Sequence, residues 1–304
     1  MTKLKIGSYV VDITNQDKIY FPTTITKGDL IDYYIKVAPF MIKHIKDRPI
    51  MMHRFPGGIT GESFYQKNAA EHFPAWIKTI PVPKSDGHTN FVLCQNAATL
   101  IYLANFGTIT FHPWLSRFKA LDNPDKLIFD LDPSVHDFSK VIEVAFLIKK
   151  ILEQVGLNPF VMTTGSHGLH VVAPIKPTAD FTYSKMFADG CAQLLIAGHP
   201  ELVTTQLRKD KRENKIFIDT LRNQFGATAV APYSVRAHPH APVATPLEWH
   251  ELENPKLESQ TYTIINIFNR LEKIDDPWKD IFKKKKSLEK AWPKLEQILT
   301  ELKT

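Results

Sequence analysis

The residues best suited to chemistry are two aspartates, Asp130 and Asp132, at the end of an apolar segment. Lys126–Phe129 precedes them and Pro133 follows directly, a pattern that predicts a buried strand stopped by proline. Because residues i and i+2 of a strand point to the same face, the two carboxylates are expected to project together. Like charges at a partly buried site repel each other unless a cation neutralises them, and hard divalent cations prefer carboxylate oxygens. The pair therefore favours a metal site over two aspartates in a surface turn.

A third carboxylate, Asp219, also stands at the end of an apolar segment, Ile216–Ile218. Two strands that deliver three aspartates would provide the arrangement that two-metal phosphoryl transfer needs. The run 208–215 just before this segment holds five basic residues, which are equally typical of a solvated face.

A loop rich in glycine and hydroxyl groups is expected within Pro159–Pro174, between two short strands. It contains Thr164, Ser166 and His167, and His170 follows on the second strand. Backbone N–H groups, hydroxyls and histidines in such a loop suit a phosphate or a ribose. A hairpin with ordinary polar residues in its turn explains the same pattern.

The segment Lys84–Gly87 contains Lys-x-Asp-Gly, the shape of the nucleophile motif of covalent nucleotidyltransferases such as DNA ligases. Asp-Gly is also a common hairpin turn, since glycine takes positive φ at no steric cost. No second ligase-like motif follows in the sequence. We therefore interpret the segment as a turn between paired strands.

The elements that must position these residues alternate between short strands and amphipathic helices. Helices are predicted at 30–45 with Thr26 as N-cap, and at 96–105, 138–155, 181–196, 263–273 and 287–302. Strands are predicted at 6–13, 77–82, 89–93, 108–111, 126–129 and 216–219. No internal repeat or low-complexity linker interrupts them, so one compact domain over 1–304 is expected.

Composition is ordinary for a soluble globular protein, with 43% hydrophobic and 23% charged residues among 304. Lys and Arg number 38 against 32 for Asp and Glu, and this excess favours a polyanionic partner. Cys94 and Cys191 have no zinc-site spacing, which suits a reducing compartment. No apolar run reaches the length of a signal or membrane-spanning segment, so a cytoplasmic location is expected.

In their order along the chain, the motifs resemble the polymerase domain of bacterial DNA ligase D, in the archaeo-eukaryotic primase superfamily. Phe129–Pro133, Thr164–His170, Asp219–Asn223 and Ala231–Arg236 carry the resemblance, which also extends to 15–21, 63–75, 112–114 and 241–252. It implies an α+β, two-lobed, primase-like fold with mixed and antiparallel sheets flanked by helices. The implied lobes are N-terminal, about 1–110, and catalytic, about 111–250, followed by a closing helical segment at 251–304.

The resemblance also implies an activity: a polymerase of non-homologous end joining that fills gaps and extends 3′ ends with two divalent cations, Mn²⁺ or Mg²⁺. A preference for ribonucleotides is implied as well, with the Thr164 hydroxyl and His112 placed to bond a 2′-hydroxyl. The implied partners are broken or gapped DNA with a 5′-phosphate, nucleoside triphosphates, Ku, and a DNA ligase acting in trans. The protein would then be associated with the nucleoid.

Individual residues match positions of that family's motifs. The catalytic metal ligands are matched by Asp130, Asp132 and Asp219, and the nucleotide-binding positions by His112, Thr164, Ser166, His170, Arg212, Arg222 and Arg236. The 5′-phosphate pocket is matched by Asn15, Lys18 and Lys27, with Phe64 and Tyr65 as an aromatic pair that stacks on DNA beside it. Two positions depart from the pattern, because His53 and His167 stand where more basic residues are usual.

Three other classes share part of the pattern. Haloacid-dehalogenase-like phosphatases also begin with a strand and Asp-x-Asp, but their motif lies near the chain start and Pro133-Ser134 fits it poorly. Nucleotide-sugar glycosyltransferases use Asp-x-Asp without requiring a basic groove. A non-catalytic nucleic-acid-binding module would explain the charge, but it would not need three aspartates at strand ends.

Overall fold

The structure is a computed structural model that describes residues 2–134 and 137–302. The chain forms two compact units, each made of several segments. Unit 1 contains the chain up to Trp114, with Thr228–Ala244 and Tyr262–Ile274; unit 2 contains Leu115–Ala227, Thr245–Thr261 and the chain from Asp275 onward. The first crossing lies close to residue 110, where the N-terminal lobe was expected to end. Later segments return to both units, so contiguous sequence ranges do not describe this division.

Unit 1 is built on a five-stranded antiparallel sheet, in the order β4-β3-β6-β5 with β7 also paired to β3. Its strands are β3 (Pro49–Arg54), β4 (Phe64–Gln66), β5 (Thr79–Lys84), β6 (Gly87–Leu93) and β7 (Thr108–Pro113). A separate hairpin, β1 (Thr2–Ile6) and β2 (Tyr9–Ile13), precedes the sheet. The helices are α1 (Lys27–Ile45), α2 (Ala97–Asn105) and the short α5 (Ile267–Leu271).

Helix α1 begins where its sequence predicts. The Thr26 hydroxyl accepts from the backbone N–H of Asp29, and the Asp29 carboxylate accepts from the N–H of Thr26, which completes a capping box. Residues three and four apart along the helix, such as Tyr34, Val37 and Met41, are fully buried in the core of unit 1. The N-cap prediction is confirmed.

Two predicted elements of unit 1 are wrong in extent. Residues 6–13 form a tight turn and strand β2 rather than one strand, because Gly7 adopts φ +58° and reverses the chain. Of the helix expected at 263–273, only Ile267–Leu271 is α-helical. The Thr263 hydroxyl accepts from the N–H of Ile265 and the Asn266 amide oxygen from the N–H of Thr263, so side chains replace the first helical turn.

The Lys-x-Asp-Gly segment is a hairpin turn, as interpreted from sequence. Lys84 pairs with Gly87 across the β5–β6 ladder, and Gly87 adopts φ +126°. The Lys84 ammonium lies 3.1 Å from the carboxylate of Asp86 in an exposed ion pair. An exposed, locally paired lysine gives no sign of a buried nucleophile.

Unit 2 is built on a six-stranded mixed sheet in the order β13-β14-β10-β12-β11-β15. The strands are β10 (Lys126–Asp132), β11 (Phe160–Thr163), β12 (Leu169–Pro174), β13 (Val203–Thr204), β14 (Ile216–Asp219) and β15 (Pro246–Leu247), and β8 (Ser116–Arg117) pairs separately with β9 (Ala120–Pro124). Among the strand pairs described for this sheet, β13 and β14 run parallel and the others antiparallel. The expected α+β class with mixed and antiparallel sheets is confirmed.

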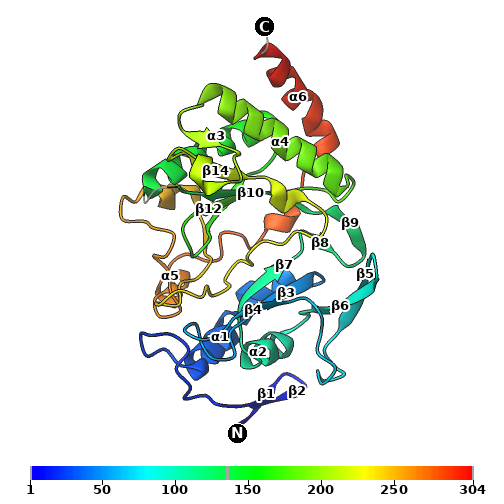
Figure 1. The fold of residues 1–304 in the computed structure, drawn as a ribbon, viewed down its shortest axis with the longest axis vertical. Coiled ribbons are helices and arrows are strands. Elements are labelled where there is room, and N and C mark those ends of the chain that lie inside the picture. Colours follow the sequence, from blue (N-terminus) through cyan, green and yellow to red (C-terminus); the bar gives the residue numbers. More distant parts are fainter. Residues whose placement is uncertain (1, 135–136, 303–304) are drawn as a thin grey trace. The chain divides into compact units, whose positions relative to one another are not determined.

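Helices α3 (Phe138–Gln154) and α4 (Phe181–Gly198) pack against each other over one face of this sheet (Figure 1). Helix α6 (Leu288–Glu301) packs against α4. Short 3-10 turns occur at η1 (Lys209–Lys211), η2 (Leu221–Asn223), η3 (Trp249–Glu253) and η4 (Ile281–Lys283). Over residues 2–134 and 137–302, no helix combines the length and apolarity that crossing a membrane requires.

Candidate active site

Strands β10 and β14 bring the three aspartates to one face of the unit 2 sheet. β10 runs through both of its aspartates and stops before Pro133, so it is longer than the predicted 126–129. In the antiparallel register Asp130 lies opposite Asp219, and Asp132 lies two residues further along the same face. The predicted convergence of the carboxylates follows from this register.

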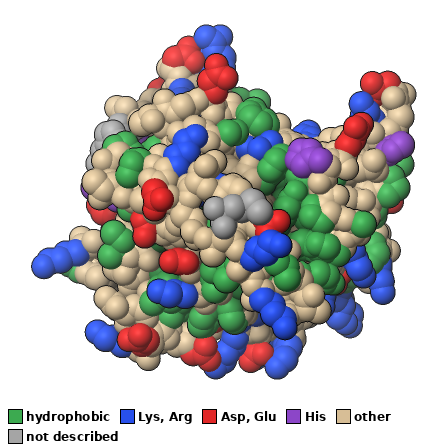
Figure 2. All heavy atoms as spheres, turned by 90° about the horizontal axis from the view of Figure 1, so that it is seen from below, with side chains coloured by type: hydrophobic (Ala, Val, Ile, Leu, Met, Phe, Trp, Pro, Cys, Tyr) green, Lys and Arg blue, Asp and Glu red, His purple; other side chains and the backbone are tan. Residues whose placement is uncertain are grey.

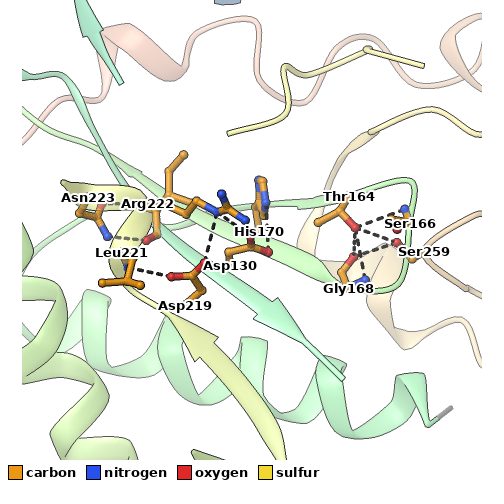
Figure 3. Close-up of polar contacts among 11 residues, drawn as sticks. Asp130, Thr164, Ser166, Gly168, His170, Asp219, Leu221, Arg222, Asn223 and Ser259 are labelled. Carbon is orange, nitrogen blue, oxygen red and sulfur yellow. Dashed lines mark hydrogen bonds and ion pairs between the residues drawn. The ribbon is translucent and has the colours of Figure 1, made fainter. Parts of the chain in front are cut away.

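Asp130 is paired with two basic side chains (Figure 3). Its Oδ2 accepts a hydrogen bond from Arg222 Nε at 3.0 Å, and its Oδ1 lies 3.2 Å from His170 Nε2. Burial alone raises the pKa of Asp130, but the charges and hydrogen bonds of His170 and Arg222 outweigh burial and hold the pKa below its ordinary value. Asp130 is therefore an anion already compensated within the protein.

Asp132 and Asp219 carry charge that is less well compensated. Burial, together with the charge of Asp130, raises the pKa of Asp132 to about 6. Burial also raises the pKa of Asp219, although Arg222 opposes the shift from 3.4 Å away. Even with Arg222 and His170 as opposite charges, the three carboxylates leave excess negative charge, which is an environment that attracts a cation.

The three carboxylates fit hard divalent cations in ligand type and in charge. Among the described residues, however, no three His, Cys, Asp or Glu side chains are grouped so as to hold an ion. Arg222 spans Asp130 and Asp219, with its Nε within 3.4 Å of a carboxylate oxygen of each. A cation bound by these carboxylates would share Asp130 and Asp219 with this guanidinium.

The loop between β11 and β12 is organised by the Thr164 hydroxyl (Figure 3). Its oxygen accepts from the N–H of Ser166 at 3.3 Å and of Gly168 at 3.2 Å, and its O–H donates to the carbonyl of Gly168. These two N–H groups point into the loop, so they are not presented to a phosphate as the sequence suggested. The Ser166 hydroxyl, 3.0 Å from His167 Nδ1, forms an exposed pair instead.

Glycine is required at position 168 because the loop packs closely against the strand that carries Asp130 and Asp132. A Cβ atom there would lie 1.8 Å from the carbonyl oxygen of Leu131, the residue between Asp130 and Asp132. Any residue larger than glycine at position 168 would therefore displace the loop or β10.

His170 and Arg212, both expected to hold the nucleotide, are largely buried. His170 lies opposite Asp130 in the β10–β12 register, and its Nδ1 has no hydrogen-bond partner among the described residues. Arg212 donates to the carbonyls of Gln206 and Leu207 and stacks 3.8 Å over the ring of Phe217. In this conformation the guanidinium of Arg212 therefore stabilises the loop that precedes it in the sequence.

Two side chains that sequence reasoning missed hold the site together. The buried amide of Asn223 accepts from the N–H of Ile128 at 2.9 Å and donates to its carbonyl at 2.7 Å. The buried hydroxyl of Ser259 donates to the Gly168 carbonyl at 2.9 Å. Their partners are 95 and 91 residues away along the chain, so no local sequence pattern could reveal them.

Unit 1 brings together the three residues expected to bind a 5′-phosphate. Asn15 adopts φ +53° in the turn that places Lys18, whose Nζ donates to the carbonyl of Pro56 at 2.8 Å. The Lys18 carbonyl accepts from the backbone N–H of Lys27, and the buried Lys27 ammonium donates to the carbonyl and hydroxyl of Thr14. Neither ammonium has an ion-pair partner among the described residues. Burial and the charge of Lys18 lower the pKa of Lys27 to about 8.

Phe64 and Tyr65 are both exposed on β4, but they do not form a parallel pair. As successive strand residues they point to opposite faces. Arg54 lies 5.0 Å from the centroid of the Phe64 ring, whereas Tyr65 stacks on His53 with ring centroids 4.1 Å apart. Tyr65 also meets His112 edge-on, with centroids 5.9 Å apart.

His112 and the segment that carries Arg236 lie side by side in unit 1. The hydroxyl of Thr110 on β7 donates to the carbonyl of Val235 at 2.7 Å, which fixes Arg236 beside that strand. Burial and the charge of Arg236 lower the pKa of His53 to about 4. At neutral pH, His53 is therefore an uncharged aromatic partner of Tyr65. It does not supply the positive charge that a more basic residue would have at this position.

Comparison with known proteins gives a consistent result. A family model described as "LigD, primase-polymerase domain" matches residues 26–278. Multifunctional non-homologous end joining protein LigD of Mycobacterium bovis is 34% identical over 262 residues, 83% of this chain and 34% of the relative. Bifunctional non-homologous end joining protein LigD of Bacillus subtilis is 31% identical over 277 residues, 90% of this chain and 44% of the relative. The chain thus spans less than half the length of these relatives.

A solved structure, the polymerase domain from Mycobacterium tuberculosis ligase D in complex with DNA, superposes with a TM-score of 0.86. It is 31% identical in sequence, and the match covers 91% of this chain and 99% of the other.

Proposed function

Because the chain belongs to the LigD primase-polymerase domain family, we propose that it is a nucleotidyltransferase that fills gaps and extends 3′ ends in non-homologous end joining. The observation that carries the proposal is the group of three carboxylates in unit 2, from Asp130, Asp132 and Asp219. Arg222 and His170 both contact Asp130. Phosphoryl transfer depends on positioning and charge stabilisation, and this group supplies both.

Asp130, Asp132 and Asp219 would hold two divalent cations, Mn²⁺ or Mg²⁺. When bound, these supply activation of the 3′-hydroxyl and neutralisation of the leaving pyrophosphate. His170 keeps Asp130 ionised and oriented from the neighbouring strand. Arg222 neutralises the carboxylates before loading and then offers its guanidinium to a phosphate, which its planar donors suit.

In unit 1, we propose that Lys18 and Lys27 bind the 5′-phosphate of a downstream strand, with Asn15 in the turn that positions Lys18. Two ammonium groups without ion-pair partners among the described residues support this role. The aromatic rings of Phe64 and Tyr65 are exposed for stacking on bases, one on each face of β4. DNA as substrate would place the protein at the nucleoid of the cytoplasm.

The proposal extends to partners and to the sugar. The names of the relatives refer to non-homologous end joining, and a Ku-type end-binding protein and a DNA ligase acting in trans are the partners such a reaction needs. We also propose a preference for ribonucleotides, on the family resemblance, with His112 as the residue that meets the sugar.

Primer extension on a gapped DNA with a 5′-phosphate, Mn²⁺ and nucleoside triphosphates tests the activity. The wild type should extend the primer, and Asp130→Ala should abolish extension while DNA affinity stays within about twofold, because the carboxylate acts on the metals and not on the duplex. Asp122→Ala, at an exposed position on β9, is the matched control. Extension by Asp130→Ala at the wild-type rate contradicts the proposal. A folded wild type without extension would favour a phosphatase, a glycosyltransferase or a non-catalytic module instead.

A further inference from the structure

The loop Thr164–Gly168 is held from outside by one short segment of unit 2. Ser259, only 3% exposed, donates from its hydroxyl to the carbonyl of Gly168 at 2.9 Å and lies 3.3 Å from the Thr164 hydroxyl. The next residue, Gln260, donates from its side-chain amide to the carbonyl of Ser166 at 2.9 Å. Two consecutive side chains therefore bond to carbonyls on either side of His167.

The residues between these two anchored carbonyls face outward. Ser166 and His167 form their exposed side-chain pair here, and both line a cavity of about 390 Å³ together with Ser259 and Gln260. Pro133, which follows the aspartates of β10, lines the same cavity. The outward pair is thus set beside the end of the strand that carries the candidate metal ligands.

The position of the loop is coupled to β10 through Gly168. The carbonyl that Ser259 anchors belongs to the residue that packs directly against Leu131, with no room even for a methyl group. Gly165 takes φ +66°, a conformation that glycine reaches without strain, so backbone preference does not fix the loop by itself. The anchoring hydrogen bonds supply that restraint.

On the proposed function, we propose that Ser259 and Gln260 are positioning residues for the incoming nucleotide. They fix the carbonyls of Gly168 and Ser166, and through them they set the Ser166 hydroxyl and the His167 ring where a triphosphate meets the end of β10. Their contribution is to keep the loop in the binding conformation before the nucleotide arrives, which lowers the cost of binding.

A positioning role has a signature that a merely structural role lacks. Gln260→Ala and Ser259→Ala should raise both the Kd and the KM for nucleoside triphosphate by roughly three- to tenfold, the factor expected for one lost hydrogen bond. The kcat and the affinity for gapped DNA should stay within about twofold, because the aspartates and unit 1 are untouched. Gln260→Glu should weaken binding further, since its carboxylate cannot donate to the Ser166 carbonyl.

Two variants serve as matched controls in the same unit. Ser184→Ala removes an equally buried hydroxyl from α4, and Gln297→Ala removes an exposed amide that donates to Glu301 within α6. Both should leave Kd and KM unchanged. Thermal unfolding of every variant separates a loss of fold from a loss of positioning. Gln260 is the more exposed of the two anchoring residues, so the Gln260 variants are expected to fold normally.

Nucleotide affinity is measured by calorimetry with ATP, and KM by primer extension. Wild-type Kd and KM in folded Gln260→Ala and Gln260→Glu would overturn the inference, and so would an equal rise in the controls. A wild type that binds ATP but does not extend a primer would refute the proposed function. The Kd comparison would then remain as the test of positioning by Ser259 and Gln260.

Discussion

Lys27 is a buried lysine whose proton is weakly held. Burial and Lys18 lower its pKa from 10.5 to about 8, so the ammonium form is lost as pH rises through about 8. A terminal phosphate remains a dianion over that range, since its second pKa is about 6. Lys27 changes its charge within this range, and a bound dianion would raise its pKa.

We therefore expect the affinity ratio for gapped DNA with a 5′-phosphate over a 5′-hydroxyl to be highest near pH 7. The ratio should fall several-fold by about pH 9.5, because a neutral amine no longer attracts the dianion. Fluorescence anisotropy with both DNAs measures it. Lys27→Arg, which keeps its charge at every pH tested, should show no such fall above pH 8. A pH-independent ratio in the wild type would exclude Lys27 from the pocket.

Thr164 was expected to bond the 2′-hydroxyl of a ribonucleotide, but its hydroxyl is turned into its own loop. Thr164→Val, which replaces the hydroxyl with a methyl of similar size, should leave the N–H groups of Ser166 and Gly168 without that acceptor. The KM values for GTP and dGTP should therefore rise together, by about tenfold, and their ratio should stay within about twofold. Single-nucleotide addition measures both. If only the use of GTP were lost, Thr164 would be the residue that recognises the 2′-hydroxyl.

At the scale of elements, the site depends on how η2 is attached to β10. After β14 ends at Asp219, the Asn223 amide pairs with both backbone groups of Ile128, much as another strand residue would. The same amide donates to the carbonyl of Thr220 and closes the turn that carries Arg222. One side chain thus fixes the position of a basic residue relative to Asp130.

Asn223→Ala should lower the free energy of unfolding by roughly 2–4 kcal/mol, because two buried backbone groups lose their partner. Urea unfolding followed by circular dichroism measures this. Asn254→Ala, at an exposed turn where the side chain accepts from the N–H of Lys256, should cost less than about 1 kcal/mol. If the two variants are equally stable, the amide of Asn223 is not needed to attach η2.

Sequence patterns located the elements that carry the site where local signals were strong. An apolar run ended by aspartate and proline identified β10, and Thr26 with Asp29 identified the start of α1. The failures occurred where side chains or a single glycine override the hydrophobic pattern, at Gly7 and at Thr263. Side chains that act across the fold, such as Asn223 and Ser259, leave no local pattern at all.

At the scale of the whole molecule, the net charge of +6 does not by itself identify a DNA-binding surface. On the face drawn in Figure 2, lysine and arginine side chains are scattered among acidic and apolar ones. The proposed DNA binding therefore rests on individual cations such as Lys18 and Lys27, and not on a basic patch of this face. The order of motifs identified the family, but the two units are each assembled from separate segments, which a linear sequence does not reveal.

Mn²⁺ binding is the sharpest test of the proposal that the carboxylates of β10 and β14 form the metal site. The electron paramagnetic resonance signal of free Mn²⁺ should fall when wild-type protein is added, because bound ions lose that signal. Asp132→Asn should bind Mn²⁺ at least about tenfold more weakly, since a neutral amide replaces the least compensated carboxylate. Asp122→Asn should bind like the wild type. Equal Mn²⁺ affinity in the wild type and Asp132→Asn would contradict the account.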